Sequence, residues 1–256
     1  MSEVGEAVLD QREGAVARVT LNRPEKRNAL NEALINGLKS SLRRASDDAL
    51  VRVVVISGAG NDFCSGADLA SLQKIADGSV AENMADARSL MELFVLMRQI
   101  KVPVVAAVRG KALAGGCGLA SACDIVLASA EAQFGYPEVK IGFVPAMVMA
   151  ILRRNVSEKR AFELITRGEQ ISAAEAKQIG LVNQVFPEEE FDSAVTAYVN
   201  GFTTVSKSAV ALTKTLLYQM DGMSFGDALQ TGVEVNVIAR MSEDCQEGIA
   251  RFLKRT

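Results

Sequence analysis

The stretch KALAGGCGLASACD at 111–124 joins two patterns that are typical of different secondary structures. The apolar run VPVVAAV at 102–108 leads into it and indicates a buried strand, whereas LASAC at 119–123 indicates a helix. The joint itself, KALAGGCG at 111–118, holds three glycines and no hydroxyl, histidine or acid. The first N–H groups of a helix have no partner within the helix, and glycine allows another atom to approach them closely. We therefore expect accessible backbone N–H groups here.

A second joint of this kind is NDFCSGADLASL at 61–72, which follows the apolar strand pattern VVVIS at 53–57. Gly66 lies in its turn of small residues, and a helix is expected to begin after it. Two N–H groups directed at one oxygen form an oxyanion hole, and helix N-termini favour such negative charge. The two joints could meet and form one, or both could simply be tight turns.

Other uses of the glycines fit the sequence less well. A GxGxxG dinucleotide motif would take Gly116 and Gly118 as its first two glycines, but Ser121 occupies the third position. No GK[ST] follows, so a phosphate-binding loop is not indicated either. These mismatches disfavour a nucleotide-dependent oxidoreductase.

The composition excludes several classes of protein. The chain has 256 residues, 49% of them hydrophobic, and a net charge of −3, which disfavours nucleic acid as a partner. The longest apolar runs are shorter than the ~18 residues of a membrane-spanning helix, and no signal-peptide pattern opens the chain. The sequence thus predicts a soluble cytoplasmic protein with no nucleic-acid or membrane partner.

The chain contains no histidine, which excludes Ser-His-Asp and Cys-His catalysis and imidazole-bound zinc. Its four cysteines are scattered without a CxxC pair, so neither a disulfide framework nor a metal site is expected. Any proton transfer must depend on a carboxylate, lysine, tyrosine, cysteine or water.

Glu138 is the carboxylate whose surroundings suggest such a role. It lies in YPEVKIGFVP at 136–145 among apolar and aromatic residues. Loss of hydration there would raise its pKa toward neutrality and suit it to move protons. The alternative is an ordinary solvated surface glutamate.

The pattern of elements predicts an α/β core at 1–200 and a helical C-terminal region at 201–256. Ser172 and Glu175 have the spacing of a helix capping box. Strands are expected at 15–22, 51–58, 102–108, 124–130 and 181–186, and the main helices at 31–48, 80–101, 116–123, 146–154, 157–168, 172–180, 187–200, 206–220, 224–241 and 243–254.

Five stretches that span nearly the whole chain resemble, in the right order, the motifs of the crotonase superfamily, also called the enoyl-CoA hydratase/isomerase family. They are LNRPEKRNALN at 21–31, FCSGADL at 63–69, the segment 112–145, AAEAKQIGLVNQV at 173–185 and EGIARFLKR at 247–255. The resemblance implies an α/β fold with a crotonase-like ββα spiral core and a helical C-terminal trimerisation region. It also implies a homotrimer or homohexamer.

The resemblance further implies an acyl-CoA thioester as substrate, with no separate cofactor, because coenzyme A is part of the substrate. Because their positions match the family's motifs, the resemblance implies that the Ala67 and Gly115 N–H groups form the oxyanion hole and that Glu138 is the catalytic acid. Residues matching the family's coenzyme A contacts are Lys26, Arg27, Ala67, Phe252 and Arg255.

Gly118 departs from the family's two-glutamate hydratase pattern, because it occupies the position of the first glutamate. A single carboxylate can carry a proton between C2 and C4, so we expect isomerisation of 3-enoyl-CoA to 2-enoyl-CoA. Hydration with a second acid from elsewhere, such as the segment 70–85, and a non-catalytic acyl-CoA-binding protein are the alternatives. PAMVM at 145–149 replaces a glycine-rich run of many relatives and would line an acyl pocket or pack in the core.

Overall fold

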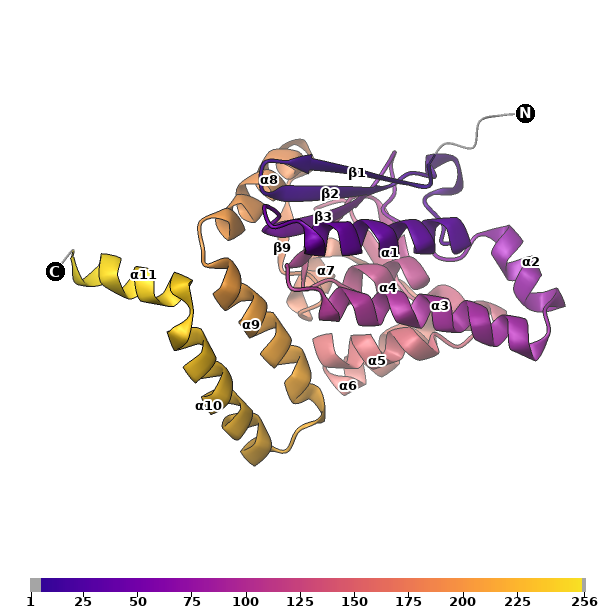
Figure 1. Ribbon diagram of the computed structural model, residues 1–256. Helices are drawn as coiled ribbons and strands as arrows, with labels where there is room; N and C mark the ends of the chain where they lie inside the picture. The colour runs from indigo at the N-terminus through magenta and orange to yellow at the C-terminus, as the bar shows by residue number, and fades with distance from the viewer. Residues whose placement is uncertain (1–5, 255–256) are drawn as a thin grey trace.

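In the computed structural model, which describes residues 6–254, six strands form the main sheet in the order β1-β2-β3-β4-β6-β9 (Figure 1). β1 pairs antiparallel with β2, and all the other neighbours are parallel. The strands are β1 (Val8–Glu13), β2 (Val16–Leu21), β3 (Val53–Gly58), β4 (Val104–Val108), β6 (Ile125–Ser129) and β9 (Gln184–Phe186).

A smaller sheet of three strands carries the two segments that matter most for the site. β5 (Lys111–Leu113) pairs parallel with β7 (Gln133–Gly135), which pairs antiparallel with β8 (Gln170–Ser172). The glycine-rich helix α4 (Gly115–Ala122) begins just after β5, and the short helix η2 (Pro137–Ile141), which contains Glu138, follows β7. The ladder between β5 and β7 therefore places Glu138 beside the start of α4.

The remaining helices cover both faces of the main sheet or follow it. They are α1 (Glu32–Asp47), α2 (Leu69–Asp77), α3 (Val80–Gln99), α5 (Ala146–Asn155), α6 (Glu158–Arg167), α7 (Ala173–Gln178), α8 (Phe191–Asn200), α9 (Lys207–Gln219), α10 (Phe225–Met241) and α11 (Glu243–Leu253). Short 3₁₀ helices connect them: η1 (Pro24–Lys26), η3 (Glu188–Glu190), η4 (Gly201–Thr203) and η5 (Met220–Gly222).

Parallel strands are buried on both faces, and β3 shows the alternation that this requires. Val54 and Ile56 pack into the large core together with α1, α3 and α4, whereas Val53 and Val55 face a smaller core formed with α8. Neither face of the strand meets solvent over residues 53–56, which explains why this part of the sequence is uniformly apolar.

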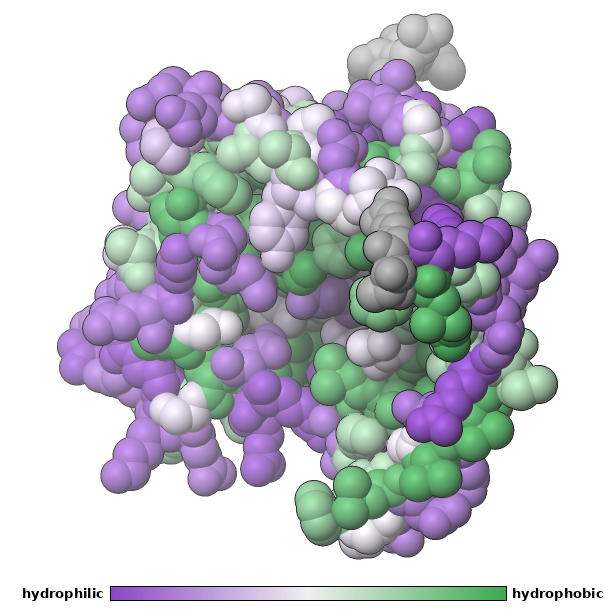
Figure 2. Space-filling view, turned by 90° about the vertical axis from the view of Figure 1, so that its left-hand side faces the viewer, coloured by the Kyte–Doolittle hydropathy of each residue, from purple (hydrophilic) through white to green (hydrophobic). Residues whose placement is uncertain are grey.

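The C-terminal helices extend to one side of the body (Figure 1). α9 packs against α3, and α10 and α11 lie further out. Figure 2 views this side and shows apolar side chains gathered on it. Among residues 6–254, the large exposed apolar side chains on α10 are Phe225, Leu229, Val233, Val237, Ile238 and Met241.

The structure confirms the α/β class and the helical C-terminal region, with local corrections. The strands β5, β7 and β8 are not predicted, because each has only three residues. β1 is not predicted, because its sequence VLDQRE is mostly charged or polar; it pairs only along its β2 side, and most of its residues are exposed. The capping box at α7 is wrong in one half: Ser172 accepts the N–H of Glu175, but the Glu175 carboxylate binds Arg160 instead. Across residues 6–254 we find no helix that combines the length and the apolar character needed to cross a bilayer.

Candidate active site

One isolated bridge, between Cys64 and Ala112, brings the two glycine-containing joints together. The Cys64 N–H donates to Lys111 O at 3.0 Å and the Leu113 N–H donates to Cys64 O at 2.9 Å. The two joints lie so close together that a Cβ atom built on Gly66 would be 3.6 Å from the Gly115 nitrogen. A Cβ atom on Gly116 would lie only 2.2 Å from Cys64 O, so glycine is needed there for the contact.

The N–H groups of Ala67 and Gly115 are both without an acceptor among the residues that the structure describes. The bridge beside Ala67 uses its neighbours instead: Leu30 N–H donates to Gly66 O, and Asp68 N–H donates to Leu30 O. Ala114, which precedes α4, has a φ of 52°, a value uncommon for a residue other than glycine and often found at functional sites. Two free donors therefore lie in adjoining segments.

A cavity of about 750 Å³, called the main cavity below, opens at these donors. Ala67, Gly115 and Glu138 all line it, so the structure brings together the three residues to which the sequence assigns a catalytic role. Its other walls come from α1, α2, α3, α5 and the segment 137–145 before α5. They are mostly apolar and include Leu72, Leu90, Phe143, Met147 and Val148. This size and lining are typical of sites for small organic ligands.

Glu138 is half-buried, and its Oε2 atom is buried without a hydrogen-bond partner among the described residues. Burial raises the pKa of the Glu138 carboxyl above its ordinary value, while its own backbone N–H opposes that rise. The prediction of a desolvated carboxyl is confirmed. A carboxylate in this state can accept a proton from a bound molecule more readily than a solvated one can.

Position 118 faces the neighbouring helix α5. A Cβ atom built on Gly118 would lie 2.5 Å from Cγ2 of Val148. Val148, which belongs to the PAMVM stretch, also lines the main cavity, as does Met147. The space in which a side chain at 118 would begin is thus already filled by an apolar group.

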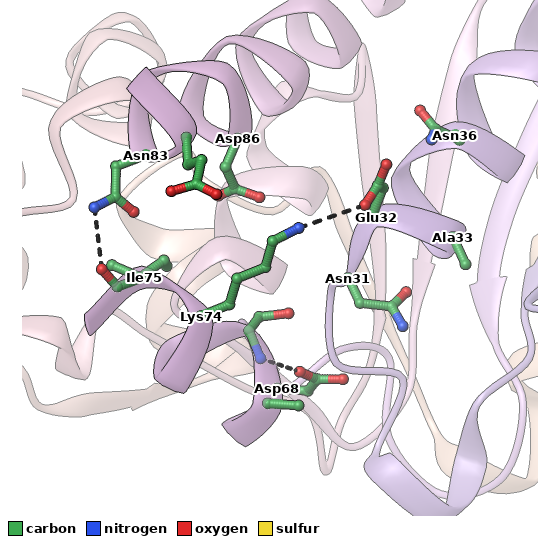
Figure 3. A pocket seen from close by; sticks show the side chains of 12 residues that line it. Asn31, Glu32, Ala33, Asn36, Asp68, Lys74, Ile75, Asn83 and Asp86 are labelled. Atoms are coloured by element: carbon green, nitrogen blue, oxygen red, sulfur yellow. Dashed lines mark hydrogen bonds and ion pairs between the residues drawn. The ribbon is translucent and has the colours of Figure 1, made fainter. Parts of the chain in front are cut away.

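A polar cavity of about 540 Å³ adjoins the main cavity between α1, α2 and α3 (Figure 3). Figure 3 shows Lys74 on α2 reaching toward Glu32 on α1, an ion pair of 3.7 Å between exposed side chains. Asp86 on α3 lines both cavities. Asp86 is not predicted as a site residue. The available signal is its helical spacing with Asn83, Ala87 and Leu90, all of which line the main cavity.

The residues matched to coenzyme A contacts lie in two other places. Lys26 and Arg27 lie in the exposed turn of η1, where the Arg27 carbonyl accepts the N–H of Ser65, a residue of the main cavity. Phe252 lies on α11 and does not line the main cavity of this single chain. Arg255 lies outside the described residues. Their role in binding coenzyme A stays a prediction.

Asp68 supports the segment around Ala67 and does not itself line the main cavity. Burial alone would raise the pKa of its carboxyl, but hydrogen bonds from Ser71 and Arg23 outweigh burial and lower it. It accepts the Ser71 N–H at 2.7 Å, which caps α2, and its ion pair with Arg23 measures 2.8 Å. Asp68 thereby fixes the segment that follows Ala67.

Comparison with known proteins agrees with this geometry. The sequence model of the family Enoyl-CoA hydratase/isomerase matches residues 11–256. A Thermus thermophilus protein provisionally named an enoyl-CoA hydratase is 40% identical over 242 residues, 94% of this chain and 96% of the relative. The mitochondrial enoyl-CoA hydratase domain-containing protein 3 of Xenopus laevis is 36% identical over 245 residues, 96% of this chain and 83% of its own length.

Among solved structures, that of a Mycobacterium smegmatis enoyl-CoA hydratase superposes with a TM-score of 0.93 at 31% identity, covering 97% of this chain and 96% of that one. The chain therefore belongs to the enoyl-CoA hydratase/isomerase family and has the crotonase fold. This is a family of enzymes that act on acyl-CoA thioesters.

Proposed function

We propose that this protein isomerises 3-enoyl-CoA to 2-enoyl-CoA thioesters with one carboxylate. The observation that carries the proposal is the meeting of two unpartnered N–H groups and the desolvated Glu138 at one cavity. The Ala67 and Gly115 N–H groups hold the thioester oxygen. Hydrogen bonds at that oxygen stabilise the negative charge that develops when a proton leaves C2.

In the proposed mechanism, the Glu138 carboxylate takes a proton from C2 of the bound 3-enoyl thioester. The resulting dienolate has its charge on the thioester oxygen, where the two N–H groups bind it. The Glu138 carboxylic acid then returns the proton to C4, and the double bond moves from C3–C4 to C2–C3. Glu138 is then a carboxylate again, so the reaction needs neither water nor a second acid.

The contact between Gly118 and Val148 supports isomerisation over hydration. Hydration requires a group that holds and activates water as well as one that protonates carbon. At position 118 this chain has no side chain, and Val148 fills the space beside it. An apolar wall there disfavours a bound water molecule.

Hydration is the second candidate, and Asp86 is the observation that favours it. Its carboxylate lines the main cavity from α3, so it could serve as the second acid that position 118 lacks. The names of the relatives and of the superposed structure are those of hydratases. A non-catalytic acyl-CoA-binding protein is the third possibility.

We also propose that Lys26 and Arg27 bind the phosphates of coenzyme A and that the protein forms a homotrimer or homohexamer. Cations near phosphates are favourable, and the η1 turn contacts the segment of Ala67. In an oligomer, Phe252 and Arg255 of a neighbouring copy could reach the nucleotide. The exposed apolar side chains of α10 support such assembly.

The test is to incubate the protein with a medium-length 3-enoyl-CoA and follow mass and ultraviolet absorbance. Isomerisation gives an unchanged mass with the absorbance of a conjugated enoyl thioester, whereas hydration adds one water. Glu138→Gln should lower turnover by about 10²–10⁴-fold without weakening acyl-CoA binding. Asp86→Asn is the matched carboxylate-to-amide control: it should leave an isomerase nearly unchanged, and a comparable loss would favour hydration. No turnover of either kind would favour a binding protein.

A further inference from the structure

The segment that carries Glu138 is joined to α4 by a hydrogen bond inside the core. The hydroxyl of Tyr136, a fully buried residue, lies 2.9 Å from Oγ of Ser121, which is also buried. The Ser121 hydroxyl lies 2.7 Å from Cys117 O and donates its one hydrogen there. The Tyr136 hydroxyl must then be the donor to Ser121, which fixes the direction of both bonds.

This bond connects the two halves of the candidate site. Ser121 lies on α4, the helix that begins at Gly115, and Tyr136 precedes Glu138 by two residues. A second connection, at the start of α4, is the bond from Ala114 N–H to Gly135 O at 2.8 Å. The segment before Glu138 is therefore held to α4 at both ends of the helix.

Neighbouring contacts leave this hydrogen-bonded pair little freedom. The Asn155 side chain at the end of α5 donates to Ser121 O at 2.9 Å. Burial raises the pKa of the Cys117 thiol to about 11, so the thiol beside Tyr136 carries no charge at neutral pH. The charged side chains that share the main cavity with Glu138 are Asp86 and Lys140, and neither contacts Tyr136 by a hydrogen bond.

Packing alone does not require a hydroxyl at position 136. Phe134, two residues earlier, is buried to the same degree without one. A buried hydroxyl must keep its partner, since losing the partner costs stability, and the bond therefore holds the two segments in one arrangement. Small displacements of a reacting group can lower a rate by up to about 10²-fold.

We propose that Tyr136 and Ser121 are positioning residues that hold the Glu138 carboxylate at a set place relative to the Gly115 N–H. The proposal rests on the proposed function of that site. The hydrogen bond acts on the chemical step and not on binding, because neither hydroxyl reaches the cavity lining.

The first test compares Tyr136→Phe and Ser121→Ala with the wild type in the 3-enoyl-CoA assay. We expect kcat to fall about tenfold in each variant, with KM within about twofold of wild type. The double variant should lose no more than Tyr136→Phe alone, because both changes remove the same bond. A kcat within twofold of wild type, or losses that multiply in the double variant, would overturn the proposal.

Tyr218→Phe is the matched control. It also removes one tyrosine hydroxyl, which donates to Asp124 at 2.6 Å, but it lies on α9 and outside the main cavity. It should lower the melting temperature without changing kcat. An equal fall of kcat in Tyr218→Phe would show a general effect of destabilisation and would overturn the positioning role.

A readout without turnover separates this proposal from the proposed function. The pKa of Glu138 can be followed by NMR in protein labelled with [13C]glutamate, with Glu138→Gln to assign its signal. We expect Tyr136→Phe to lower that pKa toward the ordinary glutamate value and Tyr218→Phe to leave it unchanged. If the wild type turns over neither 3-enoyl- nor 2-enoyl-CoA, the proposed function fails, and this titration decides: an unchanged pKa overturns the positioning role.

Discussion

The carboxyl group of Glu138 has one oxygen, Oε2, buried without a hydrogen-bond partner among the described residues. Burial raises its pKa, so the charged form is less favourable in the folded protein than in the unfolded chain. Its contribution to stability is fully present below the pKa of the unfolded chain, near 4.5, and is lost as pH rises through the folded pKa. The charged carboxylate that the proposed reaction needs thus destabilises the fold.

We therefore expect Glu138→Gln to raise the melting temperature at pH 7 by a few degrees while it abolishes most turnover. The gain should shrink as pH falls toward 4.5, because the wild-type carboxyl is then protonated and resembles the amide. Thermal unfolding of both proteins from pH 4 to 8 measures the difference in their melting temperatures. The exposed Glu131→Gln is the control and should change little at any pH. A Glu138→Gln protein less stable than wild type at pH 7 would contradict the assignment.

At the scale of elements, the contact of α4 with α5 determines which side chains can lie near the N–H groups of Ala67 and Gly115. Gly118 is buried, and its missing side chain allows Val148 to approach. A glycine in mid-helix is usually unfavourable, so here it is the close packing of two helices that makes it suitable. The same contact fills the space of the acid that two-glutamate hydratases have.

We expect Gly118→Ala to destabilise the protein by about 1–3 kcal/mol, because the new methyl group would collide with Val148. Adding Val148→Ala should recover part of the loss. Gly248→Ala on α11 is the matched control: nothing lies within 4 Å of its Cβ position, so it should stabilise by up to about 1 kcal/mol. Urea unfolding measures the free energy of unfolding of the wild type and the three variants. A Gly118→Ala protein as stable as wild type would show that Val148 moves aside freely.

At the scale of the whole molecule, a buried ion pair attaches the C-terminal helices to the core. Lys214 on α9 donates to Asp124 at 2.7 Å and to the carbonyls of Met97 and Val102 at 2.8 and 3.0 Å. The Asp124 carboxylate also accepts the Val104 N–H and the Tyr218 hydroxyl, both at 2.6 Å. Both charged groups therefore have several hydrogen-bond partners. Burial lowers the pKa of Lys214, whereas the nearby Asp124 carboxylate opposes that change.

Lys214→Met should cost about 3–5 kcal/mol of unfolding free energy, since it leaves the Asp124 carboxylate without its cation. Lys207→Met on the same helix is the control: Lys207 donates only to carbonyls near the surface, and its loss should cost about 1 kcal/mol or less. Urea unfolding compares the free energies of unfolding of the two variants. Equal effects of the two substitutions would exclude this attachment.

Much of the site follows from local sequence. The runs of apolar residues determine strands β3 and β4, and the helix expected from residue 31 does begin there, where Asn31 accepts the Leu34 N–H at 3.0 Å. The two glycine joints and the apolar surroundings of Glu138 are also local patterns. They predict free N–H groups and a desolvated carboxyl because helix ends and side-chain hydration depend mainly on nearby residues.

Packing across the chain determines which distant residues meet. Asp86 joins the cavity of Glu138, Val148 fills the space beside Gly118, Tyr136 pairs with Ser121, and Lys214 pairs with Asp124. None of these contacts can be predicted from a single stretch of sequence, because each depends on how helices and strands from distant parts of the chain pack together. The N–H donors, the desolvated carboxyl and the class of fold can be predicted from the sequence, since they arise from local backbone and apolar patterns. The neighbours of these groups cannot, because they depend on long-range packing.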